Sequence, residues 1–480
     1  MTIKFCLTSL ILMLLGMPSM SQKAALDSLL RDSIMINGAV SFTVRDADKG
    51  VILFDYNGEK SLSQASVMKL VTTAAAIEIL GPGHRFTTTV GYSGHITPKG
   101  KLIGDIVIRG GGDPALGSER FPEYYTNFLE KWADEINNLG IRKVKGRVIC
   151  DDSYFDYYPV PPKWMWEDIG NYYGAGVYGL SIYENTIKRH YLTGKEGSRP
   201  HLTYSEPSLR IISFADSLLA SGSTDEGYAW SAPYSGNGWI TGTIPANMND
   251  FILKVSIPDP PLAAAQIFDK VLKARNISTG SKPSTTRLKG SPEGTGFAEI
   301  ARTPSPPLSE ILVPLNHESI NLYAEDLLKE LGKTAGGGGS TLEGIKVVRH
   351  FLDSLGVNIK GLFIEDGCGL SPQDAINSSA LSDLLSKMKR NGRYFNIFYN
   401  SLPGAGKDGT LKNVFKDPVF ESSLRAKSGS IERVRSYAGY LTAKSGKALT
   451  FSIITNNFRG SSRAVVPFIE QIIKETYLNY

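Results

Sequence analysis

The 480-residue chain is too long for one compact core, because domains usually run to about 100–200 residues, so several domains are expected. Its 41% hydrophobic and 21% charged residues are typical of a globular protein and argue against a disordered or coiled-coil chain. A net charge of +5 with no dense Lys/Arg run gives no indication of a nucleic-acid partner.

The N-terminal stretch MTIKFCLTSLILMLLGMPSMS has the pattern of a secretory signal. One lysine precedes a short apolar segment over residues 5–17, and Ser19 and Ser21 are small residues suited to a cleavage site. A membrane span needs about 20 apolar residues, and this segment is shorter. We expect residues 1–21 to be a signal peptide that is cleaved. The mature protein is expected in the periplasm, without a transmembrane anchor.

The cysteines and histidines give no sign of a metal site. Cys150 and Cys368 remain after the signal, are too few for a disulfide framework, and either pair or stay reduced. The six histidines are scattered, and HESIN at His317 lacks the second histidine of the HExxH zinc motif. No metal and no cofactor are expected.

The first part of the chain predicts a helix, a hairpin and a second helix. Residues 23–34 are amphipathic, and AVSFTVRDADKGVILFDYN alternates apolar and polar residues on both sides of the turn sequence DADKG. SLSQASVMKLVTTAAAIEIL is apolar and ends at the breaker GPG, which predicts a largely buried helix.

Residues 86–289 have a different sequence pattern, in which short strand patterns are separated by Gly, Pro and Asn turns. This region is predicted to be β-rich. Two helices are expected within them, in FPEYYTNFLEKWADEINNLG and PPLAAAQIFDKVLKARNI. From about residue 290 helices return, followed by the hairpin YAGYLTAKSGKALTFSIITNN and a final helix. GGGGS has a linker composition, but Ser340 and Glu343 fit a capping box, which favours a tight helix-to-helix connection.

The chain contains two matches to S-x-x-K, a spacing that places a serine and a lysine on one helix face. A partly desolvated lysine amine there can take the serine proton. Ser66 and Lys69 open the buried helix, where free backbone N–H groups can stabilise an oxyanion. Ser386 and Lys389 lie inside an amphipathic helix, and we expect Ser386 on a solvated face.

Two further short motifs also occur twice. S-x-N is found at Ser319, where a loop turns into a helix, and at Ser235, in a stretch with turn composition. The stretch AKSG contains Lys427 in one copy and Lys444 in the other. The second copy lies between two strand patterns, so its Ser-Gly pair is expected to form a hairpin turn.

With S-x-x-K, S-x-N and K-S-G in this order, the chain resembles the D-alanyl-D-alanine carboxypeptidase/endopeptidase family, the class C low-molecular-mass penicillin-binding proteins or S13 peptidases. The resemblance runs from about residue 35 to 480 and includes GGGDPAL, DGCGLS and LPGAGKDGTL. It implies an α+β fold, with a serine β-lactamase/transpeptidase-like domain in which helices cover an antiparallel sheet. Residues 22–85 and 290–480 would form this domain, and residues 86–289 a β-rich insertion of two small domains.

The resemblance also implies roles for the motif residues. Ser66 would be the acylated nucleophile and Lys69 its general base. Ser319 would pass the proton to the departing D-alanine, and Asn321 would hold the substrate backbone.

The third motif would bind the substrate's C-terminus. Lys427 would supply the cation for the terminal carboxylate together with Ser428, and Gly429 would let the peptide approach the strand. The backbone N–H groups of Ser66 and Ser430 would form the oxyanion hole.

One departure from the family pattern concerns reading of the peptide side chain. Family members that bind a diaminopimelate side chain have an arginine just after the DGSGLS-type loop, where this chain has Pro372. Asp151 and Glu432 remain as candidate substrate-binding residues. Two acids without the arginine favour an amine over a carboxylate at this position of the substrate.

The predicted function is therefore a serine D-Ala-D-Ala carboxypeptidase, also with D,D-endopeptidase activity, acting on peptidoglycan stem peptides ending in D-Ala-D-Ala and inhibited by β-lactams such as penicillins. A β-lactamase or esterase of the same fold is one alternative, because it uses the same acylation residues. A non-catalytic cell-wall binding protein is a second.

Overall fold

The computed structural model describes residues 18–290 and 296–480. The chain divides into two compact units, and each is described by itself. The first comprises Met1–Pro82, Leu312–Ile320 and Ile345–Tyr480, and the second comprises Gly83–Ile311 and Asn321–Gly344. Most of the predicted signal peptide lies outside the described residues.

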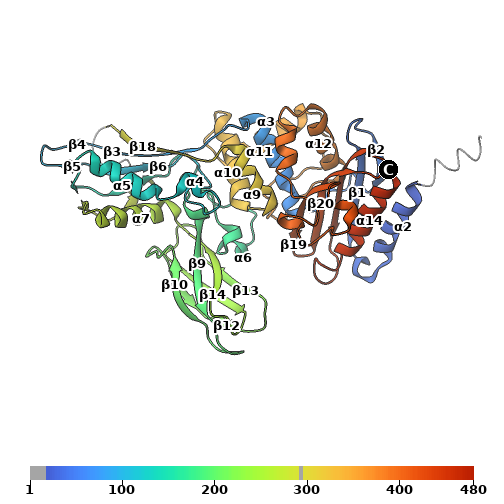
Figure 1. The fold of residues 1–480 in the computed structure, drawn as a ribbon, viewed down its shortest axis with the longest axis horizontal. Helices are drawn as coiled ribbons and strands as arrows, with labels where there is room; N and C mark the ends of the chain where they lie inside the picture. The colour runs from blue at the N-terminus through green and yellow to red at the C-terminus, as the bar shows by residue number, and fades with distance from the viewer. Residues whose placement is uncertain (1–17, 291–295) are drawn as a thin grey trace, which may run out of the picture. The chain divides into compact units, whose positions relative to one another are not determined.

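The first unit is built on a five-stranded sheet in which the order is β19-β20-β21-β1-β2 and every pairing is antiparallel. Strand β1 from the N-terminal part pairs with β21 near the C-terminus, so both ends of the chain form one sheet (Figure 1). This confirms the predicted sheet arrangement. The strands are β1 Ala39–Asp46, β2 Ile52–Tyr56, β19 Leu424–Ile431, β20 Val434–Thr442 and β21 Ala448–Asn456.

Helices cover both faces of this sheet. On one face, α2 and α14 pack on a core that includes Phe42, Phe451 and Ile469. On the other face lies α12, where the Tyr440 hydroxyl donates to the Leu385 carbonyl at 2.9 Å. The helices are α2 Pro18–Arg31, α3 Met68–Leu80, α9 Leu308–His317, α11 Thr341–Ser354, α12 Ser378–Asn391, α13 Phe395–Asn400 and α14 Val466–Asn479; α9 and α11 each begin in the second unit.

The expectation for Ser386 is wrong. Its side chain is fully buried in α12, and its Oγ donates to the Ala47 carbonyl at 3.0 Å. Serine hydroxyls line much of the interface between α12 and the sheet, as at Ser41 and Ser378, whose Oγ atoms are 2.7 Å apart. The buried face of α12 therefore reads as polar in the sequence although it packs against the sheet.

The second unit contains most of the strands, as the sequence pattern of residues 86–289 predicts. Its strands are β3 Thr87–Tyr92, β4 His95–Ile96, β5 Lys101–Ile103, β6 Ile106–Arg109, β7 Lys143–Val144, β8 Val148–Asp151, β9 Thr186–Leu192, β10 His201–Glu206, β11 Ser213–Asp216, β12 Leu219–Ala220, β13 Glu226–Trp230, β14 Asn237–Ile244, β15 Phe251–Ser256, β16 Ser278–Thr279, β17 Ser284–Thr285 and β18 Ala298–Pro304. Its helices are α4 Pro122–Tyr125, α5 Phe128–Asn138, α6 Trp166–Ile169, α7 Pro260–Ala274, α8 Thr286–Lys289 and α10 Asn321–Thr334.

These strands form several sheets. One has the order β17-β8-β6-β3-β18 and another β16-β7-β5-β4. Two more, β10-β9-β15 and β11-β14-β12 with β13 paired to β14, enclose a separate hydrophobic core that includes Tyr191, Ile240 and Val255.

Two boundaries differ from the sequence-based expectation. Strand β18 pairs with β3, so residues up to Ile311 group with the inserted region rather than starting the catalytic domain at residue 290. The single helix expected over residues 121–140 is two helices, because Asn127 between them adopts a left-handed backbone with φ of 56°.

The capping box is confirmed. The Ser340 N–H donates to a Glu343 carboxylate oxygen at 2.9 Å, and the Glu343 N–H donates to the Ser340 Oγ at 3.2 Å. Backbone N–H groups of Gly338 and Ser340 hold the pKa of Glu343 at about 2. GGGGS is therefore a tight connection between α10 and α11.

No helix among residues 18–290 and 296–480 is long and apolar enough to cross a membrane. Cys150 and Cys368 are both buried, the first in the second unit and the other in the first unit. No disulfide joins them within this described part of the chain.

Candidate active site

The candidate nucleophile Ser66 lies in a 3₁₀ turn, Ala65–Val67, that leads directly into α3. Ala65 has a left-handed φ of 50°, a strained backbone of the kind that clusters at functional sites. Lys69, in the first turn of α3, is fully buried, and its Nζ donates to the Ser66 Oγ at 3.0 Å. The S-x-x-K spacing thus places the amine within reach of the hydroxyl.

The loop that contains Asp366 and Cys368 also holds the amine of Lys69. The Lys69 Nζ also donates to the Cys368 carbonyl at 2.8 Å. The loop is folded around the buried Asp366 carboxylate, which accepts four backbone N–H groups at 2.6–3.1 Å, from Cys368, Gly369, Leu370 and Ser371. Asp366 therefore orients the carbonyl that holds Lys69.

A second serine–lysine pair comes from two distant segments. Ser319 follows α9 with a left-handed φ of 62°, and Lys427 lies on β19. The Lys427 Nζ donates to the Ser319 Oγ at 2.9 Å and to the Ser428 carbonyl at 2.8 Å. Burial, together with the nearby charges of Lys69 and Arg435, holds the pKa of Lys427 well below its usual 10.5.

Strand β19 also packs closely on the nucleophile turn. A Cβ at Gly429 would lie 2.5 Å from the Gln64 carbonyl oxygen and 3.0 Å from the Ser66 nitrogen, so only glycine fits there. The Ser428 Oγ donates to the Thr410 Oγ1 at 2.8 Å, which fixes the orientation of this hydroxyl. Ser430, which follows Gly429, is exposed.

A sequence model of the D-Ala-D-Ala carboxypeptidase 3 (S13) family matches residues 22–474. The chain belongs to this family. It is a serine-type D-Ala-D-Ala carboxypeptidase, and the two serine–lysine pairs described above lie within the matched region.

Similar proteins include a D-alanyl-D-alanine carboxypeptidase of Actinomadura sp. (strain R39), which is 29% identical over 466 residues and covers 92% of this chain and 82% of that protein. The crystal structure of penicillin binding protein 4 (dacB) from Haemophilus influenzae is similar with a TM-score of 0.80 and 21% identity, over 94% of this chain and 99% of that one. A predatory peptidoglycan endopeptidase from Bdellovibrio bacteriovorus has a TM-score of 0.51 and 15% identity, over 91% of this chain and 92% of that one.

Three predicted site residues are not part of this cluster in the first unit. Asn321 begins α10 in the second unit, and its side chain donates to the Tyr173 carbonyl there at 2.8 Å. Asp151, also in the second unit, ends β8 beside Arg109, with 3.5 Å between Asp151 Oδ2 and Arg109 Nε. Glu432 projects from the β19–β20 turn with its side chain 85% exposed. Their roles in substrate binding stay predictions.

The sequence reasoning missed Asp366 and Thr410 as supports of the site. Asp366 begins the quoted DGCGLS stretch, and an aspartate before small residues is the usual signal of a side chain that caps its own loop. Thr410 lies in the quoted LPGAGKDGTL stretch, but no local pattern connects it with Ser428.

Proposed function

We propose that the Ser66 Oγ attacks the carbonyl carbon of the penultimate D-alanine and that Lys69 takes the hydroxyl proton. The 3.0 Å contact between Lys69 Nζ and Ser66 Oγ carries this proposal. Attack forms an acyl-enzyme and breaks the bond to the terminal D-alanine, after which water hydrolyses the ester. The backbone N–H groups of Ser66 and Ser430 would stabilise the oxyanion.

The second pair would return the proton to the leaving group. Because the pKa of Lys427 is low, its amine can exchange a proton with the Ser319 hydroxyl, which then protonates the departing amine. An arriving substrate carboxylate favours the charged form of the same lysine, since an opposite charge raises the pKa of an amine. Lys427 would thus act both in proton transfer and, once substrate binds, as the cation for the C-terminus.

The substrates would be peptidoglycan stem peptides ending in D-Ala-D-Ala, with D,D-endopeptidase activity on cross-links and inhibition by β-lactams. The family match supports the carboxypeptidase reaction. The similarity to a penicillin binding protein and to a peptidoglycan endopeptidase supports the rest. Asn321, at the start of α10, would hold the substrate backbone.

Mass spectrometry after treatment with penicillin tests the central claim. We expect a mass increase of one penicillin on the peptide that contains Ser66, and none in Ser66→Ala. Ser386→Ala is the matched control, because Ser386 is the other S-x-x-K serine, and it should keep the adduct. An adduct on another residue, or none on folded protein, would remove the proposal.

The same acyl-enzyme separates the alternatives. A long-lived adduct supports a penicillin-binding carboxypeptidase, whereas rapid release of hydrolysed penicillin would indicate a β-lactamase. A folded protein that binds peptidoglycan without hydrolysing D-Ala-D-Ala peptides would indicate a non-catalytic binding protein.

We also propose that the protein is exported to the periplasm with removal of residues 1–21. The apolar N-terminal segment supports this proposal. N-terminal sequencing of the mature protein should start directly after Ser21, and an intact N-terminus in the cell envelope fraction would contradict cleavage.

A further inference from the structure

Three of the five tryptophans of the chain gather on one surface of the second unit. Trp166 comes from α6, and Trp230 and Trp239 are directly opposite each other on β13 and β14. Trp166 and Trp239 are 47% and 44% exposed. The opposite face of these strands is filled by Ala229 and Ile240 and supplies the hydrophobic core, so the tryptophans are not needed for that core.

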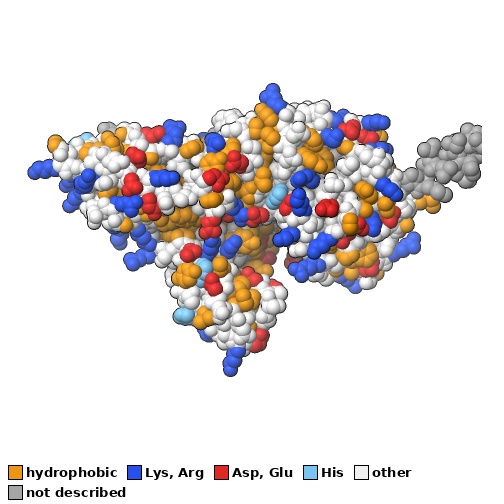
Figure 2. All heavy atoms as spheres, viewed as in Figure 1, with side chains coloured by type: hydrophobic (Ala, Val, Ile, Leu, Met, Phe, Trp, Pro, Cys, Tyr) orange, Lys and Arg blue, Asp and Glu red, His pale blue; other side chains and the backbone are white. Residues whose placement is uncertain are grey.

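The three indole rings form one platform. Trp230 and Trp239 are nearly parallel, with 8° between their planes and 6.2 Å between their ring centroids. Trp166 is tilted against both, at 6.5 and 6.3 Å. The Trp230 Nε1 donates to the Thr241 Oγ1 at 3.0 Å, which fixes this ring. In Figure 2, orange side chains appear at the surface of the lobe that carries β13 and β14 in Figure 1.

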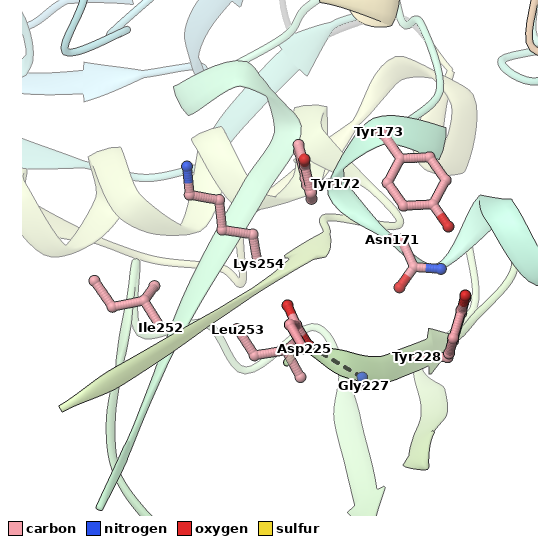
Figure 3. Close-up of a pocket in the computed structure, with 9 residues that line it drawn as sticks. All are labelled: Asn171, Tyr172, Tyr173, Asp225, Gly227, Tyr228, Ile252, Leu253 and Lys254. Atoms are coloured by element: carbon pink, nitrogen blue, oxygen red, sulfur yellow. Dashed lines mark hydrogen bonds between the residues drawn. The ribbon is translucent and has the colours of Figure 1, made fainter. Parts of the chain in front are cut away.

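The platform continues into a pocket. Tyr228 lies two residues before Trp230 on the same face of β13, and it lines a pocket of about 370 Å³. Figure 3 shows the pocket between β13, β15 and the turn that carries Tyr172 and Tyr173. Its volume is within the range of about 300–1,000 Å³ typical of small-molecule sites.

The rim of this surface is acidic. Asp225 lines the pocket, and Glu226, Glu167 and Asp168 lie close enough to Tyr228 to act on it electrostatically. Burial, with a contribution from Glu167, raises the pKa of Asp168 to about 6, so the Asp168 carboxylate is mainly ionised at neutral pH and accepts hydrogen bonds. Lys254 is the basic side chain that lines the pocket.

We propose that this surface, the indole platform of Trp166, Trp230 and Trp239 together with the adjoining pocket, binds the sugar chain of peptidoglycan. The polarised C–H groups on the faces of pyranose rings pack on the negative faces of indole rings. The carboxylates on the rim accept hydrogen bonds from sugar hydroxyl and amide N–H groups.

The charge of the rim decides between occupants. An anionic lipid surface would be repelled by the four carboxylates, whereas an uncharged N-acetylated amino sugar offers hydroxyl and amide donors to them. The choice of this particular sugar chain rests on the proposed peptidoglycan substrate. Binding there would keep the enzyme on the polymer while its active site acts on the attached peptides.

Isothermal titration calorimetry with uncharged N-acetylglucosamine oligosaccharides tests the inference. We expect saturable binding by the full-length protein and at least a tenfold loss of affinity in the double variant Trp166→Ala/Trp239→Ala. Tyr228→Ala provides a second, milder variant on the pocket side and should weaken binding several-fold. Tyr204→Ala, which removes a half-exposed aromatic side chain from β10 in the same unit, is the matched control and should bind as the wild type does.

Acylation by penicillin should be unchanged in all these variants, because the indole platform has no part in the proposed chemistry. A wild-type protein that binds glycan but is not acylated by penicillin would therefore count against the proposed function and leave this inference standing. The inference would be overturned if the wild type did not bind the glycan. It would also be overturned if the folded double variant and the folded Tyr228→Ala variant both bound it with wild-type affinity. Binding of anionic liposomes in place of glycan, or a wild-type dimer that the double variant loses, would also overturn it.

Discussion

The two copies of AKSG have identical sequences and opposite environments. Lys427 is fully buried on β19 and donates to Ser319, whereas Lys444 is exposed in the turn between β20 and β21. A Cβ at Gly429 would collide with the nucleophile turn, whereas one at Gly446 would meet open space. The same four residues therefore form part of the candidate active site in one copy and a hairpin turn in the other. The partners that surround each copy make the difference, and paired substitutions can test it.

The largest difference is expected between Lys427→Ala and Lys444→Ala. Lys427→Ala removes a proton-transfer group, which typically lowers a rate by about 10²–10⁴-fold. Lys444→Ala should leave acylation within about twofold of the wild type. The measurement is the rate of acylation by a fluorescent penicillin, and equal losses in both variants would show that the copies were assigned wrongly.

The second largest difference is expected between substitutions of the two motif glycines, Gly429 and Gly446. In Gly429→Ala the new Cβ would lie 2.4 Å from the Ser436 Oγ and 2.5 Å from the Gln64 carbonyl oxygen, so the nucleophile turn must shift. We expect acylation to fall about 10–100-fold, since small misplacements of reacting groups are costly. Gly446→Ala should leave acylation unchanged and cost about 1–2 kcal/mol of stability, because Gly446 has a φ of 88°. Normal acylation by Gly429→Ala would argue against a tight fit between β19 and Ser66.

The serines should differ less. Ser428→Ala removes a hydroxyl oriented by Thr410 and should lower kcat/KM for D-Ala-D-Ala peptides about tenfold, mainly through KM, if this hydroxyl binds the substrate carboxylate. Ser445 is exposed in the turn, and Ser445→Ala is the matched control with no expected change. A fall in kcat with unchanged KM would assign Ser428 to the chemical step instead of binding.

The last comparison concerns the pH dependence of stability. The folded state holds the pKa of Lys427 well below 10.5, so it binds fewer protons there than the unfolded state does. Wild-type stability should therefore rise with pH from the lowered pKa of the folded state up to about 10.5, by up to about 1.4 kcal/mol per pH unit. Lys427→Met should lose this slope. Its gain in stability over the wild type should be largest at pH values below the lowered pKa of Lys427.

Urea unfolding at a series of pH values measures this effect, with Lys444→Met as the control that keeps the wild-type slope. A parallel pH dependence in Lys427→Met and the wild type would mean that burial of this lysine does not shift its titration.

Much of the fold could be predicted because its elements carry strong local signals. The hairpin around DADKG alternates apolar and polar residues, the helix that follows Ser66 is an apolar run that ends at GPG, and the C-terminal hairpin has two apolar strand patterns around a Ser-Gly turn. The interface of α12 was misjudged because its buried side includes serines, and hydroxyl groups such as that of Ser386 can be buried when the sheet supplies an acceptor. The pairing of β18 with β3 joins distant segments and leaves no local signal.

The sequence by itself determined the order and spacing of the three motifs, and with them the family and the two candidate lysines. One helical turn separates Ser66 from Lys69, so their contact follows from local geometry alone. Only the tertiary structure decided that Lys427, and not Lys444, lies against Ser319, because 108 positions separate that pair. It also buried Lys427 and shifted its pKa, since desolvation depends on every segment that surrounds an amine and not on the four residues AKSG.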